Sequence, residues 1–456
     1  MSAPTDGPTG PLAWRSAPGK PATTRIDGVR DIDGACRRLT ALHPDIIDAL
    51  HEHGALYIRG LPVRSVDDFA RVRDVLIPSS TPYREKATPR SDYGDGVFSS
   101  TDLPPSQSIA MHNEKSYTLR FPGLLLFGCL LAPAVGGATP IADCRKVLSS
   151  LPPHLVARMR SVGWQLKRSY SDLISTDWRT AFSAENAKDV ERYCDDNLIA
   201  YEWQQDGNLR TSQLRPGVVR HPSTEAEVWF NRLAFWNAWS LDDELRETLL
   251  DEFGPDGLPF NSAFGDGEPP TRQDIQAVRA AYDAATVRER WEAGDLLLVD
   301  NILAAHGRDP FRGERKIVVA MGNPRGDRRL PAEHPTRRDL GVDERNRTVR
   351  PTPPVERCRC TGAATSASAD PLSRFQRAVR EHPERLAVRG SEGDLTFAEL
   401  DRSAARLAGR LFARGVGPGD RVGVQLNRGA GLITAFLGVW RAGAAYVPLD
   451  PGPGPP

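Results

Sequence analysis

The sequence predicts a mainly β core with helical insertions, followed by a small α/β segment. Between residues 26 and 325, strand-like stretches are scattered among helix-like stretches, without the regular spacing of repeated β-α-β units. The clearest strand, Leu-Leu-Leu-Phe-Gly-Cys-Leu at residues 124–130, is wholly apolar and lies between Pro122-Gly123 and Pro133. A short apolar run between turn residues is typical of a strand that is buried on both faces.

The other elements follow in chain order. A helix is expected to end with residues 46–50 at a turn around Gly54, and residues 55–59 then read as a strand. Further strands are expected at residues 227–230, 296–299 and 317–321. Further helices are expected at residues 187–197, 242–252 and 272–284.

Shifts in composition divide the chain into four parts. Residues 1–25 are rich in Pro, Gly, Ser and Thr and are expected to be a disordered leader, and residues 26–325 form the first domain. Residues 326–370 are expected to be a linker, which contains Cys358 and Cys360. This pair has metal-like spacing but no second Cys/His pair nearby, so we interpret it as linker surface.

Residues 371–456 are expected to form a second, smaller domain. It opens with a helix pattern marked by Phe375, Val379 and Ala387, continues with a helix through Leu411, and then has a strand at residues 422–426. A segment of this length can bury only a marginal core.

Composition excludes several classes of protein. The 456 residues carry 59 Lys+Arg and 59 Asp+Glu, so neither a nucleic-acid partner nor a membrane surface is expected. The longest apolar stretch, residues 123–134, is too short to span a bilayer. The N-terminus lacks the pattern of a signal peptide, and 6 cysteines in so long a chain do not make a disulfide framework. A cytoplasmic location is therefore expected.

The strongest chemical signal is the sequence Met-His-Asn-Glu at residues 111–114. If it lies on a strand, His112 and Glu114 project from the same face and can bind one metal ion. His306, which follows the strand expected at residues 296–299, offers a third ligand. Two histidines and one carboxylate form the facial triad of non-haem Fe(II) oxygenases.

A rival cluster, His51-Glu52-His53, falls at the expected helix end. Positions i and i+2 do not share a helix face, so we interpret this cluster as a solvated cap.

Five ordered motifs over about 300 residues resemble the taurine/2,4-D dioxygenase (TauD/TfdA) family of Fe(II)/2-oxoglutarate enzymes. The likeness is closest to the branch typified by the aspartyl hydroxylase of the syringomycin pathway. The motifs are Ser-Thr-Asp at 100–102, Ile-Ala-Met-His-Asn-Glu-Lys-Ser-Tyr at 109–117, Gly-Gly-Ala-Thr-Pro-Ile-Ala-Asp at 136–143, Phe-Gly-Asp-Gly at 264–267, and Gly-Asp through Asp-Asn to His-Gly-Arg at 294–308. The resemblance implies a double-stranded β-helix, or jelly roll, that uses Fe(II), 2-oxoglutarate and O2.

The resemblance also implies roles for individual residues. His112, Glu114 and His306 match the iron ligands, and Thr139 matches a hydroxyl that contacts the carboxylate of 2-oxoglutarate. Arg315 matches the arginine that pairs with the distal carboxylate, a partner that suits a planar guanidinium. Because spacing after the last histidine varies, Arg308, Arg312 and Lys316 remain alternatives.

The second domain resembles the N-terminal end of an adenylation domain of nonribosomal peptide synthetases. Leu-Thr-Phe-Ala-Glu-Leu at residues 395–400 and Trp-Arg-Ala-Gly-Ala-Ala-Tyr-Val-Pro-Leu-Asp at 440–450 are similar to its first two core motifs. The phosphate loop and all later motifs are missing, so this truncated fragment is not expected to adenylate a substrate. A relic, a docking element and a piece of a longer synthetase remain open.

The resemblance implies an oxygenase that hydroxylates an unactivated carbon, the β-carbon, of an amino acid in nonribosomal peptide or other natural-product biosynthesis, such as that of an antibiotic. The amino acid is either free or held on a carrier protein, and synthetases are the expected partners. Glu114 disfavours halogenation, which requires a small residue at that position. Two alternatives are a catalytically silent interaction module of a synthetase and an oxygenase that desaturates its substrate.

Overall fold

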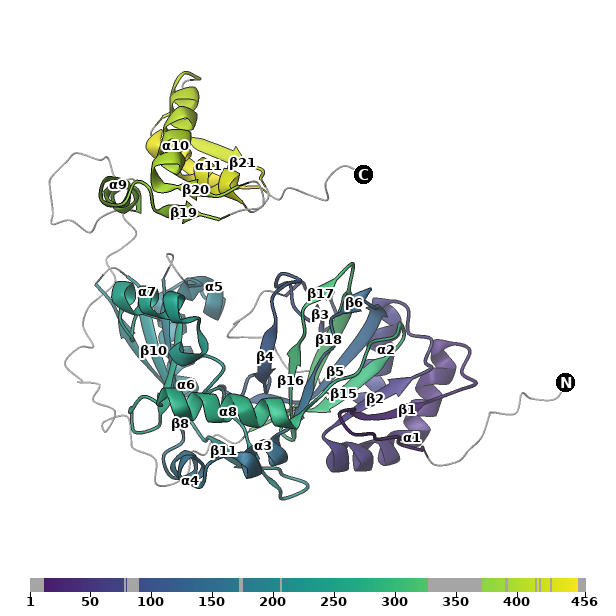
Figure 1. Ribbon diagram of the computed structural model, residues 1–456. Coiled ribbons are helices and arrows are strands. Elements are labelled where there is room, and N and C mark those ends of the chain that lie inside the picture. The colour runs from purple at the N-terminus through teal and green to yellow at the C-terminus, as the bar shows by residue number, and fades with distance from the viewer. Residues whose placement is uncertain are drawn as a thin grey trace. The chain divides into compact units, whose positions relative to one another are not determined.

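The computed structural model describes residues 12–77, 79, 90–171, 175–205, 207–326, 371–389, 393–414, 416–417, 420–426 and 429–449. The chain divides into two compact units, residues 1–353 and 354–456, and each is described by itself (Figure 1). Residues 1–11 of the predicted leader and nearly all of the predicted linker, including Cys358 and Cys360, lie outside the described residues. The predicted disorder extends too far, because residues 22–25 form a strand, β1 (Ala22–Arg25), that pairs with the next strand of the chain.

Two sheets form the centre of the first unit. The larger sheet has the strand order β1-β2-β15-β5-β18-β3 and the smaller one has the order β14-β7-β16-β4. Their bounds are β1 Ala22–Arg25, β2 Ala55–Arg59, β15 Leu296–Asp300, β5 Phe121–Leu131, β18 Lys316–Arg325, β3 Val97–Ser99, β14 Thr286–Val287, β7 Ile141–Asp143, β16 Ala304–Arg308 and β4 Ile109–His112. All these strands pair antiparallel except β1 with β2.

The two sheets share a buried core. Tyr57, Phe127 and Leu297 of the larger sheet pack in one cluster with Ile141 and Ala304 of the smaller sheet. This arrangement confirms the predicted jelly roll with helical insertions. The apolar stretch at residues 124–130 lies in β5, which pairs with strands on both sides and is buried on both faces, as predicted.

Helices α1 (Ile32–His53) and α2 (Val66–Leu76) cover the other face of the larger sheet. Leu39 and Ile46 of α1 and Phe69 of α2 pack there against Leu126 of β5. Helix α1 ends as predicted at Gly54, whose φ of 75° lies in the left-handed region and whose N–H donates to the carbonyl of Leu50. The glycine lets the chain turn directly into β2.

The insertions build a second layer of sheet and helices. A four-stranded sheet has the order β13-β8-β10-β9, and two short hairpins pair β11 with β12 and β6 with β17. The bounds are β13 Phe260–Phe264, β8 Trp164–Tyr170, β10 Leu209–Arg215, β9 Ile199–Trp203, β11 Val218–Arg220, β12 Glu227–Trp229, β6 Val135–Gly136 and β17 Phe311–Arg312. The helices are α3 Cys144–Ser150, α4 Pro153–Ser161, α5 Trp178–Phe182, α6 Ala187–Asp196, α7 Asp243–Phe253 and α8 Arg272–Ala285, with a 3-10 turn at Ala238–Ser240. The three helices predicted here, α6, α7 and α8, are confirmed to within one residue at each end.

The second unit is a small α/β fold. It contains α9 (Pro371–Glu381), the antiparallel pair β19 (Leu386–Val388) and β20 (Leu395–Thr396), α10 (Phe397–Phe412), α11 (Ala430–Arg441) and the parallel pair β21 (Arg421–Val424) and β22 (Ala445–Pro448). Ala387, assigned to the opening helix by its apolar spacing, lies in β19 instead, because the helix ends at Glu381. Thr396 caps α10 and forms a capping box with Glu399.

Within the described residues, the search for a helix with the length and apolar character of a membrane span finds none.

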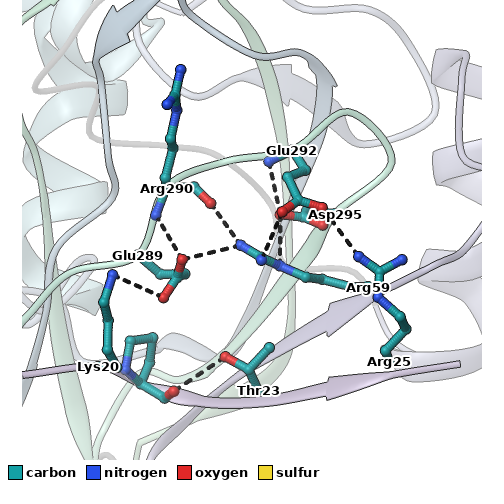
Figure 2. A network of polar contacts seen from close by, with 9 residues as sticks. Lys20, Thr23, Arg25, Arg59, Glu289, Arg290, Glu292 and Asp295 are labelled. Carbon is teal, nitrogen blue, oxygen red and sulfur yellow. Dashed lines mark hydrogen bonds and ion pairs between the residues drawn. The ribbon is translucent and has the colours of Figure 1, made fainter. Parts of the chain in front are cut away.

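A network of ion pairs ties the edge of the larger sheet to the segment before β15 (Figure 2). Arg59 of β2 pairs with Glu289, Glu292 and Asp295 at 3.3, 2.9 and 3.3 Å. Arg25 of β1 also pairs with Glu292. Asp295 is 1% exposed, and burial raises its pKa to about 6, although the backbone N–H of Glu292 and the charge of Arg59 both lower it.

This pKa predicts a pH dependence of stability. Because the folded-state pKa is higher than the ordinary value of 3.8, Asp295 stabilises the fold most below that value, and the contribution is lost as pH rises through 6. The difference in free energy of unfolding between the wild type and Asp295→Asn should change by on the order of 2–3 kcal/mol between pH 4 and pH 7. Urea unfolding across this range measures it. Glu292→Gln is the control, because this carboxylate in the same network is half exposed. Parallel stability curves for wild type and Asp295→Asn would contradict the prediction.

Candidate active site

His112 and Glu114 converge at the end of β4. The Nδ1–H of His112 donates to the carbonyl of Ala110 at 2.9 Å, so Nε2 carries the free lone pair, and it lies 3.7 Å from Oε2 of Glu114. The strand ends at His112, and Glu114 lies in the turn that follows. The prediction that both residues share one strand face was therefore wrong, although the two side chains do meet.

The side chain of Asn301 holds Glu114 in place. Its Oδ1 accepts the N–H of Glu114 at 2.7 Å, and its Nδ2 donates to the carbonyls of Glu114 and Pro122 at 2.9 and 2.7 Å. Asn113 in turn donates to the carbonyl of Asn301 at 2.7 Å. Both asparagines are fully buried, so the turn that carries Glu114 is fixed by hydrogen bonds on both sides.

His306 completes the cluster. It lies in β16 directly opposite His112 of β4, and the two rings are 4.4 Å apart between centroids. The sequence had placed it near the end of the strand at 296–299, whereas a turn at residues 301–303 separates that strand from β16. One ligand atom from each of His112, Glu114 and His306 lies within 4.8 Å of the others, and all three residues are buried.

Burial and neighbouring charges favour the protonation states that a metal ion requires. Burial and the charge of Arg232 lower the pKa of His112, and burial and His112 hold the pKa of His306 well below its ordinary value. Burial alone would raise the pKa of Glu114, but the charge of Arg90, to which Arg232 adds, holds it well below its usual range. At neutral pH the cluster therefore offers two neutral imidazoles and one carboxylate, which fit a divalent iron ion.

Thr139 and Arg315 line the same pocket as this cluster. The Nε of Arg315 donates to the carbonyl of Gly137 at 3.1 Å, and its Nη1 donates to Ser100 Oγ at 3.0 Å. Gly137 has a φ of 68°, and a Cβ there would lie 2.9 Å from Phe311 and 3.3 Å from Arg315. A glycine at this position therefore allows the side chain of Arg315 to pack against the backbone. Burial lowers the pKa of Arg315 to about 10, which leaves it protonated at neutral pH.

The alternatives to Arg315 differ in position. Arg308 also lines the pocket, but its guanidinium donates to the carbonyls of Leu103, Pro104 and Gln107. Arg312 and Lys316 are exposed and do not line the pocket. Among the carboxylates of the described residues, none forms an ion pair with Arg315, so geometry favours Arg315 as the anion-binding residue.

Sequence reasoning missed two cations and three aromatic residues that line the pocket. These are Arg90, Arg232, Tyr117, Phe127 and Phe235. Arg232 lies between Trp229 and Trp236 in the sequence, and a single arginine among aromatic residues was the available signal.

A second cluster of potential ligands combines His51, His221 and Asp300, whose ligand atoms also lie within 4.8 Å of one another. His51 lies at the helix end as predicted, but it is half-buried beside the ring of His221, so its interpretation as a solvated residue was wrong. The Nδ1 of His221 accepts the N–H groups of Ser223 and Thr224, and its Nε2–H therefore donates to Asp300 at 3.0 Å.

These bonds satisfy both nitrogens of the His221 ring. Asp300 also accepts the N–H groups of Ile302 and Leu303 through its other oxygen, which fixes the turn that contains Asn301. Because Asn301 accepts the N–H of Glu114, the cluster also stabilises the position of Glu114.

Comparison with known proteins assigns each unit separately. Residues 19–321 match the family described as taurine catabolism dioxygenase TauD, TfdA family, and residues 375–456 match the AMP-binding enzyme family. The dapdiamide synthesis protein DdaC of Enterobacter agglomerans is 38% identical over 282 residues, which cover 62% of this chain and 86% of DdaC.

The second unit is similar to a much longer protein. It is 52% identical over 77 residues to the AMB antimetabolite synthetase AmbB of Pseudomonas aeruginosa, which is 17% of this chain but only 6% of AmbB. Among solved structures, that of PvcB, described as an Fe, alpha-ketoglutarate dependent oxygenase from an isonitrile synthetic pathway, aligns with a TM-score of 0.41 and 15% identity. The alignment covers 71% of this chain and 94% of PvcB.

The contacts of Asn301 predict a large effect of its removal. Asn301→Ala should lower the free energy of unfolding of the first unit by about 2–4 kcal/mol, because it leaves the buried N–H of Glu114 and two buried carbonyls without partners. Urea unfolding followed by tryptophan fluorescence measures the change. Asn186→Ala is a matched control, because this exposed asparagine caps α6 and its loss should cost only about 1 kcal/mol. Equal effects of the two substitutions would contradict the role of Asn301.

Proposed function

Because the chain belongs to the TauD/TfdA family of Fe(II)/2-oxoglutarate-dependent dioxygenases, we propose that it hydroxylates an unactivated carbon, the β-carbon, of an amino acid in natural-product biosynthesis. The observation that carries the proposal is that His112, Glu114, His306, Thr139 and Arg315 line one pocket. The similarity to DdaC and to the antimetabolite synthetase AmbB supports an amino-acid substrate, either free or held on a carrier protein.

Each residue has a defined task in this proposal. The two imidazoles and the Glu114 carboxylate hold the Fe(II) ion, which with 2-oxoglutarate and O2 supplies the oxidising power to replace C–H by C–OH. Arg315 pairs with the distal carboxylate of 2-oxoglutarate through its planar guanidinium, and the hydroxyl of Thr139 contacts a carboxylate of the cosubstrate. Trp291 donates its indole N–H to Thr139 Oγ1 at 3.3 Å, which leaves the hydroxyl proton of Thr139 available for another acceptor.

The complete set of ligands weighs against a catalytically silent module. The test is a survey of amino acids, free and carrier-loaded, for succinate release and for the mass of the product. A gain of one oxygen supports hydroxylation, and a loss of two hydrogens identifies desaturation instead. The absence of succinate with every amino acid, from an iron-loaded protein, would reject the proposal.

The set of metal ligands predicts the effect of removing one of them. His306→Ala should abolish both Fe(II) binding and turnover, because two ligands do not retain the ion. Metal analysis after anaerobic loading and succinate release measure the two effects. His154→Ala is the control, because this histidine is exposed on α4. Full iron content and activity in His306→Ala would contradict the assignment.

The proposed role of Arg315 predicts the effect of changing this residue. Arg315→Lys keeps the charge but loses the planar fork, so the KM for 2-oxoglutarate should rise tenfold or more, about 1.4 kcal/mol. The exposed Arg312→Lys serves as the matched control and should leave the KM unchanged. If the control variant raised the KM and Arg315→Lys did not, the cosubstrate anchor would lie elsewhere.

A further inference from the structure

Trp291 is a core residue whose polar atom contacts the wall of the pocket. Its side chain is buried, and its ring lies 5.1 Å from the ring of Tyr57 in the core that the two sheets share. Its indole N–H donates to Thr139 Oγ1 at 3.3 Å. Thr139 lines the pocket together with the metal ligands, so Trp291 is connected to the pocket through this hydroxyl.

Other buried tryptophans lack such a contact. In the part of the chain that the structure describes, the indole nitrogens of Trp164 and Trp229 are buried and have no hydrogen-bond partner. Burial in this core therefore does not by itself supply an acceptor for an indole N–H. The hydrogen bond from Trp291 to Thr139 is instead a specific feature of the pocket wall.

Arg59 fixes the backbone that carries Trp291 (Figure 2). Its Nη2 donates to the carbonyl of Arg290 at 2.7 Å. Its guanidinium also pairs with Glu289 at 3.3 Å and with Glu292 at 2.9 Å. Because these partners lie on both sides of Trp291 in the sequence, the ion-pair network holds the segment of the indole against β2.

The backbone on the other side of the hydrogen bond is also fixed. The N–H of Gly137 donates to the carbonyl of Pro310 at 2.9 Å, and the carbonyl of Ala138 accepts the N–H of Asp309 at 3.0 Å. Thr139 follows these two residues directly, and its β-branched side chain has a restricted χ1 angle. The direction of its hydroxyl proton is the freedom that remains, because this proton rotates about the C–O bond.

The indole N–H restricts that rotation. A threonine hydroxyl has one proton and two lone pairs, and Trp291 occupies one lone pair, so the proton points away from the indole. A hydroxyl that accepts one hydrogen bond is also a stronger donor in the next one. A carboxylate has lone pairs and no proton, so it is the kind of partner for which this hydroxyl is prepared.

We propose that Trp291 is a positioning residue for the cosubstrate, which directs the hydroxyl of Thr139 to donate to a carboxylate of 2-oxoglutarate. Trp291 acts through Thr139 and does not itself contact the cosubstrate. This inference rests on the contact between Thr139 and 2-oxoglutarate in the proposed function, and it adds the residue that orients this contact.

The experiment is a calorimetric titration of 2-oxoglutarate into the full chain loaded with Mn(II), which measures affinity without turnover. Trp291→Phe keeps an aromatic ring in the core but removes the N–H, so it should weaken the binding of 2-oxoglutarate about threefold to tenfold, the range for one neutral hydrogen bond. Trp164→Phe is the matched control, because it makes the same change at a buried indole without a partner. This control should leave the affinity unchanged, whatever its effect on the melting temperature.

A double-mutant cycle separates positioning from a general effect on the fold. Thr139→Val removes the hydroxyl and should weaken binding about tenfold or more, because a hydrogen bond to a charged group is lost. In the Thr139→Val background, Trp291→Phe should cause no further loss of affinity, because the indole N–H no longer has its acceptor. An effect of Trp291→Phe that is equally large in both backgrounds would overturn the proposal.

A closer replacement of the indole tests the proposal if Trp291→Phe does not fold. Incorporation of 3-benzothienylalanine at position 291 replaces the N–H by sulfur and retains the size of the two fused rings. It should weaken the binding of 2-oxoglutarate as Trp291→Phe does, by about threefold to tenfold. An affinity equal to that of the wild type would contradict the role of Trp291.

The failure of this inference is distinguishable from the failure of the proposed function. If the wild type binds 2-oxoglutarate but turns over no amino acid, the proposed function fails, and the affinities of the variants still decide the role of Trp291. If the wild type hydroxylates an amino acid but Trp291→Phe binds 2-oxoglutarate as tightly as the wild type does, the positioning role is overturned while the proposed function stands.

Discussion

Glu114 is a buried carboxylate, and the site depends on keeping it ionised. Burial by itself favours the neutral acid, which binds a metal ion poorly. Arg90 at 3.1 Å supplies the opposing charge, and Arg232 adds to it. The same surroundings keep the two histidines neutral, because burial and nearby cations both disfavour an imidazolium. One electrostatic arrangement thus prepares three ligands of two chemical types for the same ion.

Correct charge is useful only if the ligands are held in position. The turn that carries Glu114 lies beyond the end of β4, so no strand ladder fixes it, and hydrogen bonds to Asn301 take over that task. Asn301 is in turn fixed because the neighbouring Asp300 binds two N–H groups of its own turn and the ring of His221. Support for the metal ligands therefore extends from β4 through the turn after β15 to the β11–β12 hairpin.

Sequence patterns predicted those elements that depend on neighbouring residues alone. The apolar stretch that became β5 and the helix end at Gly54 are local, and the His-x-Glu pair was recognised from its spacing and its resemblance to a family. The separate strand around His306 was not predicted, because Ile302 and Leu303 of the turn between β15 and β16 are apolar and continue the pattern of the strand. Arg90 and Arg232 were missed for a different reason. Their partners lie 24 and 119 positions away along the chain, and no periodicity links residues so far apart.

The arginines of the pocket lie in surroundings of different polarity. The guanidinium of Arg315 is held by a carbonyl and a serine hydroxyl, with Thr139 in the same pocket wall, so its surroundings suit a small polar acid. Arg232 is surrounded by Tyr117, Phe235 and Trp236, which offer apolar area beside the charge. Because Phe235 also packs 5.0 Å from the ring of His112, this aromatic wall extends from Arg232 to the metal ligands.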